Sequence, residues 1–566
     1  MDDSPLLSDT VKGSVDYKGR PAIRSETGRW RSAIFIIGVE IAERFSYNGI
    51  SSNLITYLTG PLQQSMVTAA VNVNTWTGVS YMLPLFGAFL ADAYLGRYRT
   101  ILLATLLYVL GLGLLTLSAV LPSFSPPSCH TSINTTSCHP PQSQIIFFFS
   151  SLYLVALAQG MHKPCTQAFG ADQFEVTDPE ECKSKSSFFN WWYFGICSGA
   201  LCTHSILTYI QDNLNWGLGF GIPCVCMVVA LTIFLLGTKT YRHSFNDDID
   251  NQFGRIALAF VAVVRSWRTA PSIAIDEEEG ETLLLHGTDQ FRFLDKEPAA
   301  STISEDSKEG WVVSGVSQVE EAKAILRLFP FWATCIVYTI VDAQYYTFFT
   351  KQGATMDRTI GSSGFKIPPA SLQTFISISI ILFMPIYDRI LIPFARVFTN
   401  IHSGITTLQR IGTGIILSLI SMVIAALVER ERLQVAIDSK IVDIPEATVP
   451  MSVWWLVPQY ILLGIAEALA MVGLQEFFYD QMPNGLKSVG LAFYLSIFGV
   501  GSFLSSFLVS GIEKVTGGDG RDSWFSNNLN RAHLDYFYWL LAGLSAIELA
   551  IFLYFTKSYV YKRTDV

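Results

Sequence analysis

The chain has 566 residues, of which 50% are hydrophobic and only 15% are charged. This balance excludes an ordinary soluble protein and favours burial in a membrane. The formal net charge of −9 says little about a solute, because much of the acid lies in the single segment Asp276–Glu279, and we expect no nucleic-acid partner.

The first thirty residues carry both charge signs and lack a continuous apolar core, so no cleavable signal peptide is expected. The first span would then act as the insertion signal. The opening string Asp2-Asp3-Ser4-Pro5-Leu6-Leu7 fits an acidic dileucine signal, although such short strings also arise by chance. We interpret Leu6 and Leu7 as sorting residues that an adaptor protein reads.

Apolar stretches of about 20 residues, long enough to cross a bilayer, recur along the chain. The first half is expected to hold six spans, at 33–58, 70–93, 100–122, 143–164, 188–211 and 216–237. The second half is expected to hold six more, at 325–349, 370–390, 405–428, 452–477, 487–511 and 534–557. The predicted fold class is therefore an all-α membrane protein with about twelve transmembrane helices.

These spans divide the chain into a leader, two six-helix bundles, a linker and a tail. The predicted bounds are 1–32 for the leader, 33–237 for the N-terminal bundle, 238–324 for the linker, 325–557 for the C-terminal bundle and 558–566 for the tail. Within the linker, 256–264 favours a short amphipathic helix over an unordered patch, and 276–307 favours disorder. Lys and Arg gather near the leader and the even-numbered loops of the first half, so both termini are expected in the cytosol.

The nine cysteines show no CxxC pattern and no His/Cys ligand spacing, so we expect neither a metal nor another cofactor. Two of them, Cys129 and Cys138, flank a polar loop that contains the sequon Asn134-Thr135-Thr136. A lumenal disulfide between them and glycosylation at Asn134 are expectations, and free thiols with an unmodified loop are the alternative.

Charged residues inside the spans are the strongest functional signal, because each costs about 2.5–3.5 kcal/mol on insertion scales unless it is paired or hydrated. Glu40, Glu43 and Arg44 are spaced by three and four residues, so they share one face of the first span. Lys163, at the end of the fourth span, adds a second cation. Protonation of one glutamate would release a cation, which makes a proton-coupled switch, whereas a static salt bridge is the alternative.

Three further acids lie in later spans: Asp342, Glu467 and Glu476. Asp342 and Glu476 lie next to the aromatic residues Tyr346 and Phe477, which favours a polar cavity lined by rings over contact with lipid. For Glu467 a purely structural role is an equal alternative.

The motifs resemble the proton-dependent oligopeptide transporter family, and within it the plant nitrate/peptide transporter branch, over essentially the whole chain. Glu40-x-x-Glu43-Arg44-Phe45 is similar to the first-helix signature of that family. Further similar blocks are Gly87–Asp92 with Gly96–Thr100, Lys163–Cys165 with Ala168–Phe174, Phe188–Phe194 and Phe365–Gln373.

This resemblance implies the major facilitator fold, with two bundles that rock about a site at the midplane, and proton symport. It implies that Glu40, Glu43, Arg44 and Lys163 couple protons, and that Glu476 binds solute or closes the bundles. Asp92 and Arg97 would form a cytosolic gate contact, with a solvated loop turn as the alternative. The solute site is expected to contain the residues Tyr47, Asp342, Tyr346 and Glu476.

The chain departs from the family pattern in ways that leave the solute open. Asp342 stands where a nitrate carrier of the branch has histidine, and a carboxylate repels nitrate unless it is protonated. Asp342 would therefore either admit cationic solutes or make anion selection depend on pH. Cys197 stands where the family commonly has asparagine. Peptide carriers tend to have paired tyrosines and often a cation just after the first-helix signature, whereas this chain has Tyr47, Asn48 and then Ser51.

We therefore expect a proton-coupled symporter of nitrate or di- and tripeptides, with protons, a small solute and the lipid bilayer as partners. The alternatives are a membrane sensor without large net flux and a carrier of hormones or glucosides. An enzyme is not expected, since no HExxH or GxSxG motif occurs. By resemblance, a kinase would modify Thr100, with a threonine that simply opens the third span as an equal alternative. The vacuolar membrane is favoured over the plasma membrane.

Overall fold

The computed structural model describes residues 10–121, 140–175, 178–244, 326–361, 364–399, 405–444, 447–482, 487–517 and 523–559. Several predictions lie outside these residues and remain predictions. They concern Leu6, Leu7, Cys129, Asn134 and Cys138, together with the linker segments 256–264 and 276–307.

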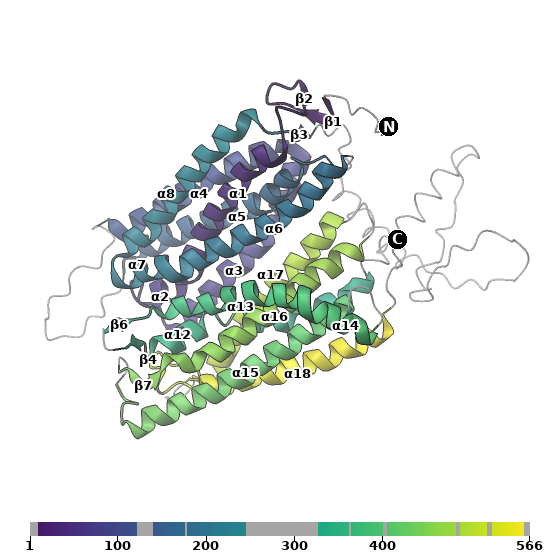
Figure 1. The fold of residues 1–566 in the computed structure, drawn as a ribbon. Coiled ribbons are helices and arrows are strands. Elements are labelled where there is room, and N and C mark those ends of the chain that lie inside the picture. Colours follow the sequence, from purple (N-terminus) through teal and green to yellow (C-terminus); the bar gives the residue numbers. More distant parts are fainter. Residues whose placement is uncertain are drawn as a thin grey trace, which may run out of the picture.

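The first half of the chain forms one bundle of helices, drawn from purple to blue in Figure 1. Its long helices pack as the pairs α4 with α5, α3 with α5 and α4 with α8, and α1 packs on α6 and α8. The elements are α1 (Arg29–Ser51), α2 (Leu54–Thr59), α3 (Met66–Leu90), η1 (Ala91–Leu95), α4 (Arg97–Val120), α5 (Gln142–Ala171), α6 (Pro179–Cys202), η3 (Thr203–Leu207), α7 (Thr208–Asn213), α8 (Trp216–Leu236) and η4 (Gly237–Lys239).

The second half forms a second bundle beside the first, drawn from green to yellow in Figure 1. It opens with helical residues 326–334 and continues with α11 (Ile336–Asp342), α12 (Phe348–Ala354), η7 (Pro369–Gln373), α13 (Thr374–Ile386), η8 (Tyr387–Leu391), α14 (Ile392–Thr399), α15 (Thr407–Asp438), η9 (Val453–Leu456), α16 (Val457–Asp480), α17 (Lys487–Thr516) and α18 (Leu534–Ser558). The short strands β4 (Met356–Asp357), β5 (Thr359–Ile360), β6 (Phe365–Lys366) and β7 (Val449–Ser452) connect helix ends.

Among the described residues, eight helical segments are long and apolar enough to cross a membrane by length and composition. The first helix, α1, is not among them, and it carries the acids Glu40 and Glu43 within its length. The predicted all-α membrane fold is confirmed.

Several helix ends differ from the predicted spans. Helix α5 continues past Pro164 to Ala171, and it packs closely on α3 one turn before the proline. A Cβ at Gly160 or at Gly87 would lie 2.3 Å from an atom of the facing helix, so only glycine permits this crossing. Helix α6 begins at Pro179, well before the predicted residue 188, and the Asp178 side chain caps it by accepting from the Glu180 N–H.

The leader is folded onto the first bundle rather than hanging free. Strands β1 (Thr10–Val15), β2 (Pro21–Ile23) and β3 (His243–Ser244) form an antiparallel sheet in the order β2-β1-β3. The sheet lies at the end of the bundle opposite α2 and α7 (Figure 1). Beneath it, the buried Arg242 guanidinium lies 2.7 Å from the Glu181 carboxylate, and Arg29 also pairs with Glu181 at 2.6 Å.

Hydrogen bonds join the two bundles at the opposite end, near α2, α7 and α12. The Gln373 amide donates to the Ser52 carbonyl at 3.0 Å, and the Thr208 and Ser371 hydroxyls lie 2.8 Å apart. Deeper in the molecule, Asn74 on α3 donates to the Ser505 hydroxyl on α17 at 3.0 Å. These contacts hold α3 against α17 and fasten the bundles together on that side.

Removal of the Glu181 carboxylate is expected to destabilise the leader sheet. Burial alone would raise the pKa of Glu181, but hydrogen bonds from Arg242, from the backbone N–H of Glu175 and from Arg29 lower it to about 2. Because the folded-state pKa lies below the ordinary value of 4.5, this stabilisation is complete above about pH 4.5 and is lost as the pH falls toward 2.

Glu181→Gln should therefore cost about 3 kcal/mol at pH 7, the low end for breaking a buried ion pair. The thermal unfolding midpoint of the detergent-solubilised protein measures this, and the deficit should shrink below pH 4.5. The exposed neighbour variant Glu180→Gln is the control. Equal midpoints for both variants would contradict the prediction.

Candidate functional site

Three charged side chains of α1 form a compact buried cluster. The exposed fractions of Glu40, Glu43 and Arg44 are 2%, 0% and 8%. The Arg44 Nε atom lies 2.9 Å from Glu40 Oε1 and 2.8 Å from Glu43 Oε2, so one guanidinium serves both carboxylates. The predicted clustering on one inward face is what the structure shows.

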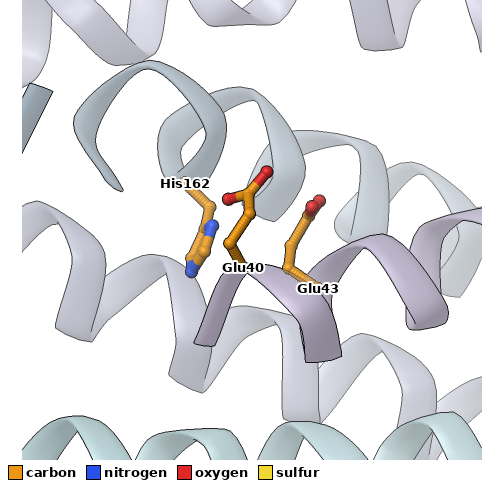
Figure 2. Close-up of side chains that lie close together, drawn as sticks. All are labelled: Glu40, Glu43 and His162. Carbon is orange, nitrogen blue, oxygen red and sulfur yellow. The ribbon is translucent and has the colours of Figure 1, made fainter. Parts of the chain in front are cut away.

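Helices α4 and α5 complete the surroundings of this cluster. The Tyr108 hydroxyl on α4 donates to Glu43 Oε1 at 3.0 Å. From α5, His162 brings a ring nitrogen within 4.8 Å of a carboxylate oxygen of each glutamate, as Figure 2 shows for the three side chains. Such a set of ligand atoms could hold a metal ion, but the Arg44 guanidinium already pairs with both carboxylates. We therefore assign no metal there.

Lys163 is placed differently from the expectation that it would pair directly with a glutamate. Among the described residues it has no ion-pair partner, and its ammonium lies 5.1 Å above the ring of Tyr81 on α3. It is still near enough to interact electrostatically with Glu40 and Glu43. The Tyr81 ring in turn packs 5.3 Å from Phe498 on α17, so Lys163 faces the second bundle across an aromatic pair.

The second bundle contributes two acids at a break in its first span. The helix stops at Asp342, the last residue of α11, and resumes at Phe348. Asp342 and Glu467 of α16 lie close enough to repel one another, and each has a buried carboxylate oxygen without a hydrogen-bond partner among the described residues. Tyrosines surround them, including Tyr346, whose ring packs 3.9 Å from that of Tyr345.

The other predicted solute residues lie at two different places. Tyr47 is buried beside the α1 cluster and stacks on Trp76 at 5.4 Å. Glu476 lies nine residues beyond Glu467 on α16, about 13 Å further along the axis. Its side chain is 47% exposed and pairs at 3.4 Å with Arg410 of the same bundle. The structure thus brings Glu467, not Glu476, together with Asp342.

The predicted gate residues lie where α3 meets α4. Arg97 at the start of α4 pairs with Asp172 at the end of α5 at 2.5 Å. The side chain of Asp92, in the π-helical turn η1, is outside the described part of the structure. Thr100 is fully buried, and its hydroxyl donates to the Gly96 carbonyl at 2.9 Å. A kinase would reach it only after this first turn opened.

Sequence reasoning overlooked Tyr108 and His162. Nothing in the spacing of α4 marks Tyr108, because its contact with Glu43 depends on how α4 packs. His162 had a usable signal: it directly precedes Lys163 and lies four residues before Thr166 on one helical face.

Two bundles of membrane helices with buried charge clusters define a polytopic membrane transporter. A family model described as the POT family matches residues 98–525. The Arabidopsis thaliana protein NRT1/PTR FAMILY 5.10 is 61% identical over 563 residues, covering 99% of this chain and 98% of that protein. NRT1/PTR FAMILY 5.14 of the same plant is 53% identical with the same coverage. The chain belongs to the POT family.

Solved structures agree on the fold. An auto-inhibited POT family peptide transporter superposes with a TM-score of 0.69 at 20% identity, covering 95% of this chain and 98% of that one. A POT family transporter in complex with 5-aminolevulinic acid gives 0.63 at 16% identity, covering 93% and 96%. The family and these neighbours are transporters, so the chain is a transporter and not an enzyme.

Proposed function

We propose that this protein is a proton-coupled symporter of small nitrogenous solutes that works by alternating access. The observation that supports coupling is the buried α1 cluster, in which one guanidinium serves two carboxylates. A proton added to either glutamate leaves Arg44 with a single anionic partner. The freed hydrogen-bonding capacity of Arg44 is then available to a solute anion or to the other bundle.

The proposed solute carries a positive and a negative group, as di- and tripeptides do. The acids Asp342 and Glu467, each with a buried oxygen that has no partner among the described residues, lie on the second bundle, whereas Lys163 lies on the first. A zwitterion would place its ammonium at the carboxylates and its anionic end toward Lys163. A bare nitrate ion would meet two carboxylates and bind well only after they are protonated, so nitrate is the second candidate.

Alternating access would start here from a state closed near α2, α7 and α12. The hydrogen bonds Gln373–Ser52 and Thr208–Ser371 would break when that side opens. We propose that this side faces the lumen or the cell exterior and that both termini face the cytosol. The division into leader, two bundles, linker and tail is kept as part of this proposal, with the leader sheet, which includes β3, packed on the N-terminal bundle.

The target membrane, the sorting residues Leu6 and Leu7 and the kinase site Thr100 remain proposals, with the vacuolar membrane favoured. Glu476 is proposed to hold α15 and α16 together through Arg410, rather than to bind solute. A sensor without net flux is the alternative function, and uptake under an imposed pH gradient distinguishes it from a symporter.

Glu40→Gln and Glu43→Gln should each abolish accumulation against a gradient, because the neutral amide cannot take up a proton. One pH unit across the membrane is worth about 1.4 kcal/mol, or a tenfold accumulation per proton. Uptake in proteoliposomes with a pH gradient measures the effect, and solute counterflow without a gradient checks folding. The exposed Glu431→Gln variant is the control. Accumulation by the Glu40 and Glu43 variants would refute proton coupling through this cluster.

Asp342→Asn and Glu467→Gln should raise the KM for a dipeptide at least about tenfold, because the ammonium loses a buried partner. The same variants should lower the KM for nitrate if nitrate is the solute, because they remove negative charge. Currents in oocytes at pH 5.5 and 7.5, with dipeptides, nitrate, hormones and glucosides, measure both outcomes. An unchanged selectivity at both pH values would overturn the assignment of these acids to the solute site.

A further inference from the structure

His162 is buried among the charges of the coupling cluster, although the motif that contains it suggests a role only for the adjacent lysine. Its exposed fraction is 0%, and the Tyr108 ring lies edge-on at a centroid distance of 6.4 Å. A ring nitrogen lies within 4.8 Å of an oxygen from Glu40 and an oxygen from Glu43 (Figure 2). One water molecule can bridge such a distance with two hydrogen bonds.

The neighbouring Thr166 fixes which ring nitrogen carries the proton. Its hydroxyl lies 2.8 Å from the His162 carbonyl, which can only accept, so the hydroxyl proton points there. The same hydroxyl oxygen lies 3.1 Å from Nδ1 and must therefore accept from an Nδ1–H group. The neutral imidazole accordingly has its basic lone pair on Nε2.

Several polar atoms of the cluster are buried without a hydrogen-bond partner among the described residues. They are the acceptors Glu40 Oε2, Glu43 Oε2 and His162 Nε2 and the donor Arg44 Nη2, although Glu43 Oε2 lies 2.8 Å from Arg44 Nε as an ion pair. Buried acceptors without donors are costly and rare in folded proteins. A single added proton, shared directly or through water, would satisfy an oxygen and a nitrogen at once.

We infer that His162 is a third proton-holding residue of the coupling site, which shares the transported proton with the glutamates of α1 through Nε2. In the transfer, the O–H bond of a protonated carboxyl breaks as the Nε2–H bond forms, and the carboxylate is regenerated. No other reactant is needed. The inference rests on the proposed proton coupling and adds a residue to it.

The charges around the imidazole determine how a proton on His162 affects the ion pairs of Arg44. Glu40, Glu43 and Arg44 face it from α1, Tyr108 faces it from α4, and Lys163 follows it on α5, with Tyr81 of α3 over that lysine. With the imidazole neutral, two carboxylates balance two cations. A proton held on Nε2 leaves both carboxylates bound to Arg44, whereas a proton on a glutamate loosens Arg44. The histidine therefore sets how readily a bound proton frees the guanidinium.

His162→Gln should shift the pH of half-maximal proton-driven uptake downward by about 0.5–1 unit, because one hydrogen bond to the protonated carboxyl is lost. Uptake of a solute that the wild type accumulates is measured in proteoliposomes from pH 5 to 8, with counterflow in the same vesicles as the check on folding. His162→Asn is the second variant. His204→Gln is the matched control, since His204 is also buried and its ring nitrogens have no partner among the described residues.

The inference holds if both His162 variants shift the pH profile, retain counterflow, and differ from the His204 control. It is overturned if they lower uptake equally at every pH or fail to differ from the control, which is the result for a packing residue. If wild-type uptake ignores the pH gradient, the proposed coupling fails and the inference fails with it. If the pH gradient drives uptake by the wild type but not by Glu43→Gln, the proposed coupling stands. If the His162 variants then keep the wild-type pH profile of uptake, only the inference about His162 fails.

Discussion

Charge balance inside the membrane is the constraint on which the rest of the structure depends. Two carboxylates on one face of α1 would be too costly in hydrocarbon, so Arg44 must lie between them, at 2.9 and 2.8 Å. That requirement turns the face inward, toward Tyr108 of α4 and His162 of α5, and places the cluster in the first bundle rather than at the lipid surface. The close crossing of α3 and α5 at Gly87 and Gly160 is near the same level, because His162 and Lys163 lie within three residues of Gly160.

The two bundles carry complementary charge toward each other. The first offers Lys163, and the second offers Asp342 and Glu467, with the Tyr81–Phe498 pair between the bundles. Lys163 lies over an aromatic ring, and among the described residues it has no ion-pair partner. The break between α11 and α12 places irregular backbone where other parts of the protein bury it, which a membrane-spanning segment tolerates.

Much of this arrangement is predictable from the sequence because it depends on local spacing. Intervals of three and four residues place Glu40, Glu43 and Arg44 together in any helix, and hydropathy marks most of the spans. What the sequence could not supply depends on packing between helices. The contact of Tyr108 with Glu43 and the ring beneath Lys163 follow from how α4 and α3 lie. That Glu467 rather than Glu476 lies beside Asp342 follows from where along α16 the break after α11 packs.

A charged residue inside a membrane helix is not necessarily a functional one. The hydrogen bonds of its carboxylate distinguish a structural acid from a functional acid. Glu429 of α15 is fully buried, yet Arg432 donates to both of its oxygens at 2.8 and 2.6 Å, and Gln352 donates at 2.8 Å. Such a saturated pair gains nothing from a proton and stabilises the helix ends around it. Glu467 and Asp342 instead keep buried oxygens without a donor among the described residues, as Glu40 does. A buried acceptor without a donor is stabilised only by a proton, a water molecule or a solute that reaches it. A transporter is the kind of protein that can bring each of these to the site in turn.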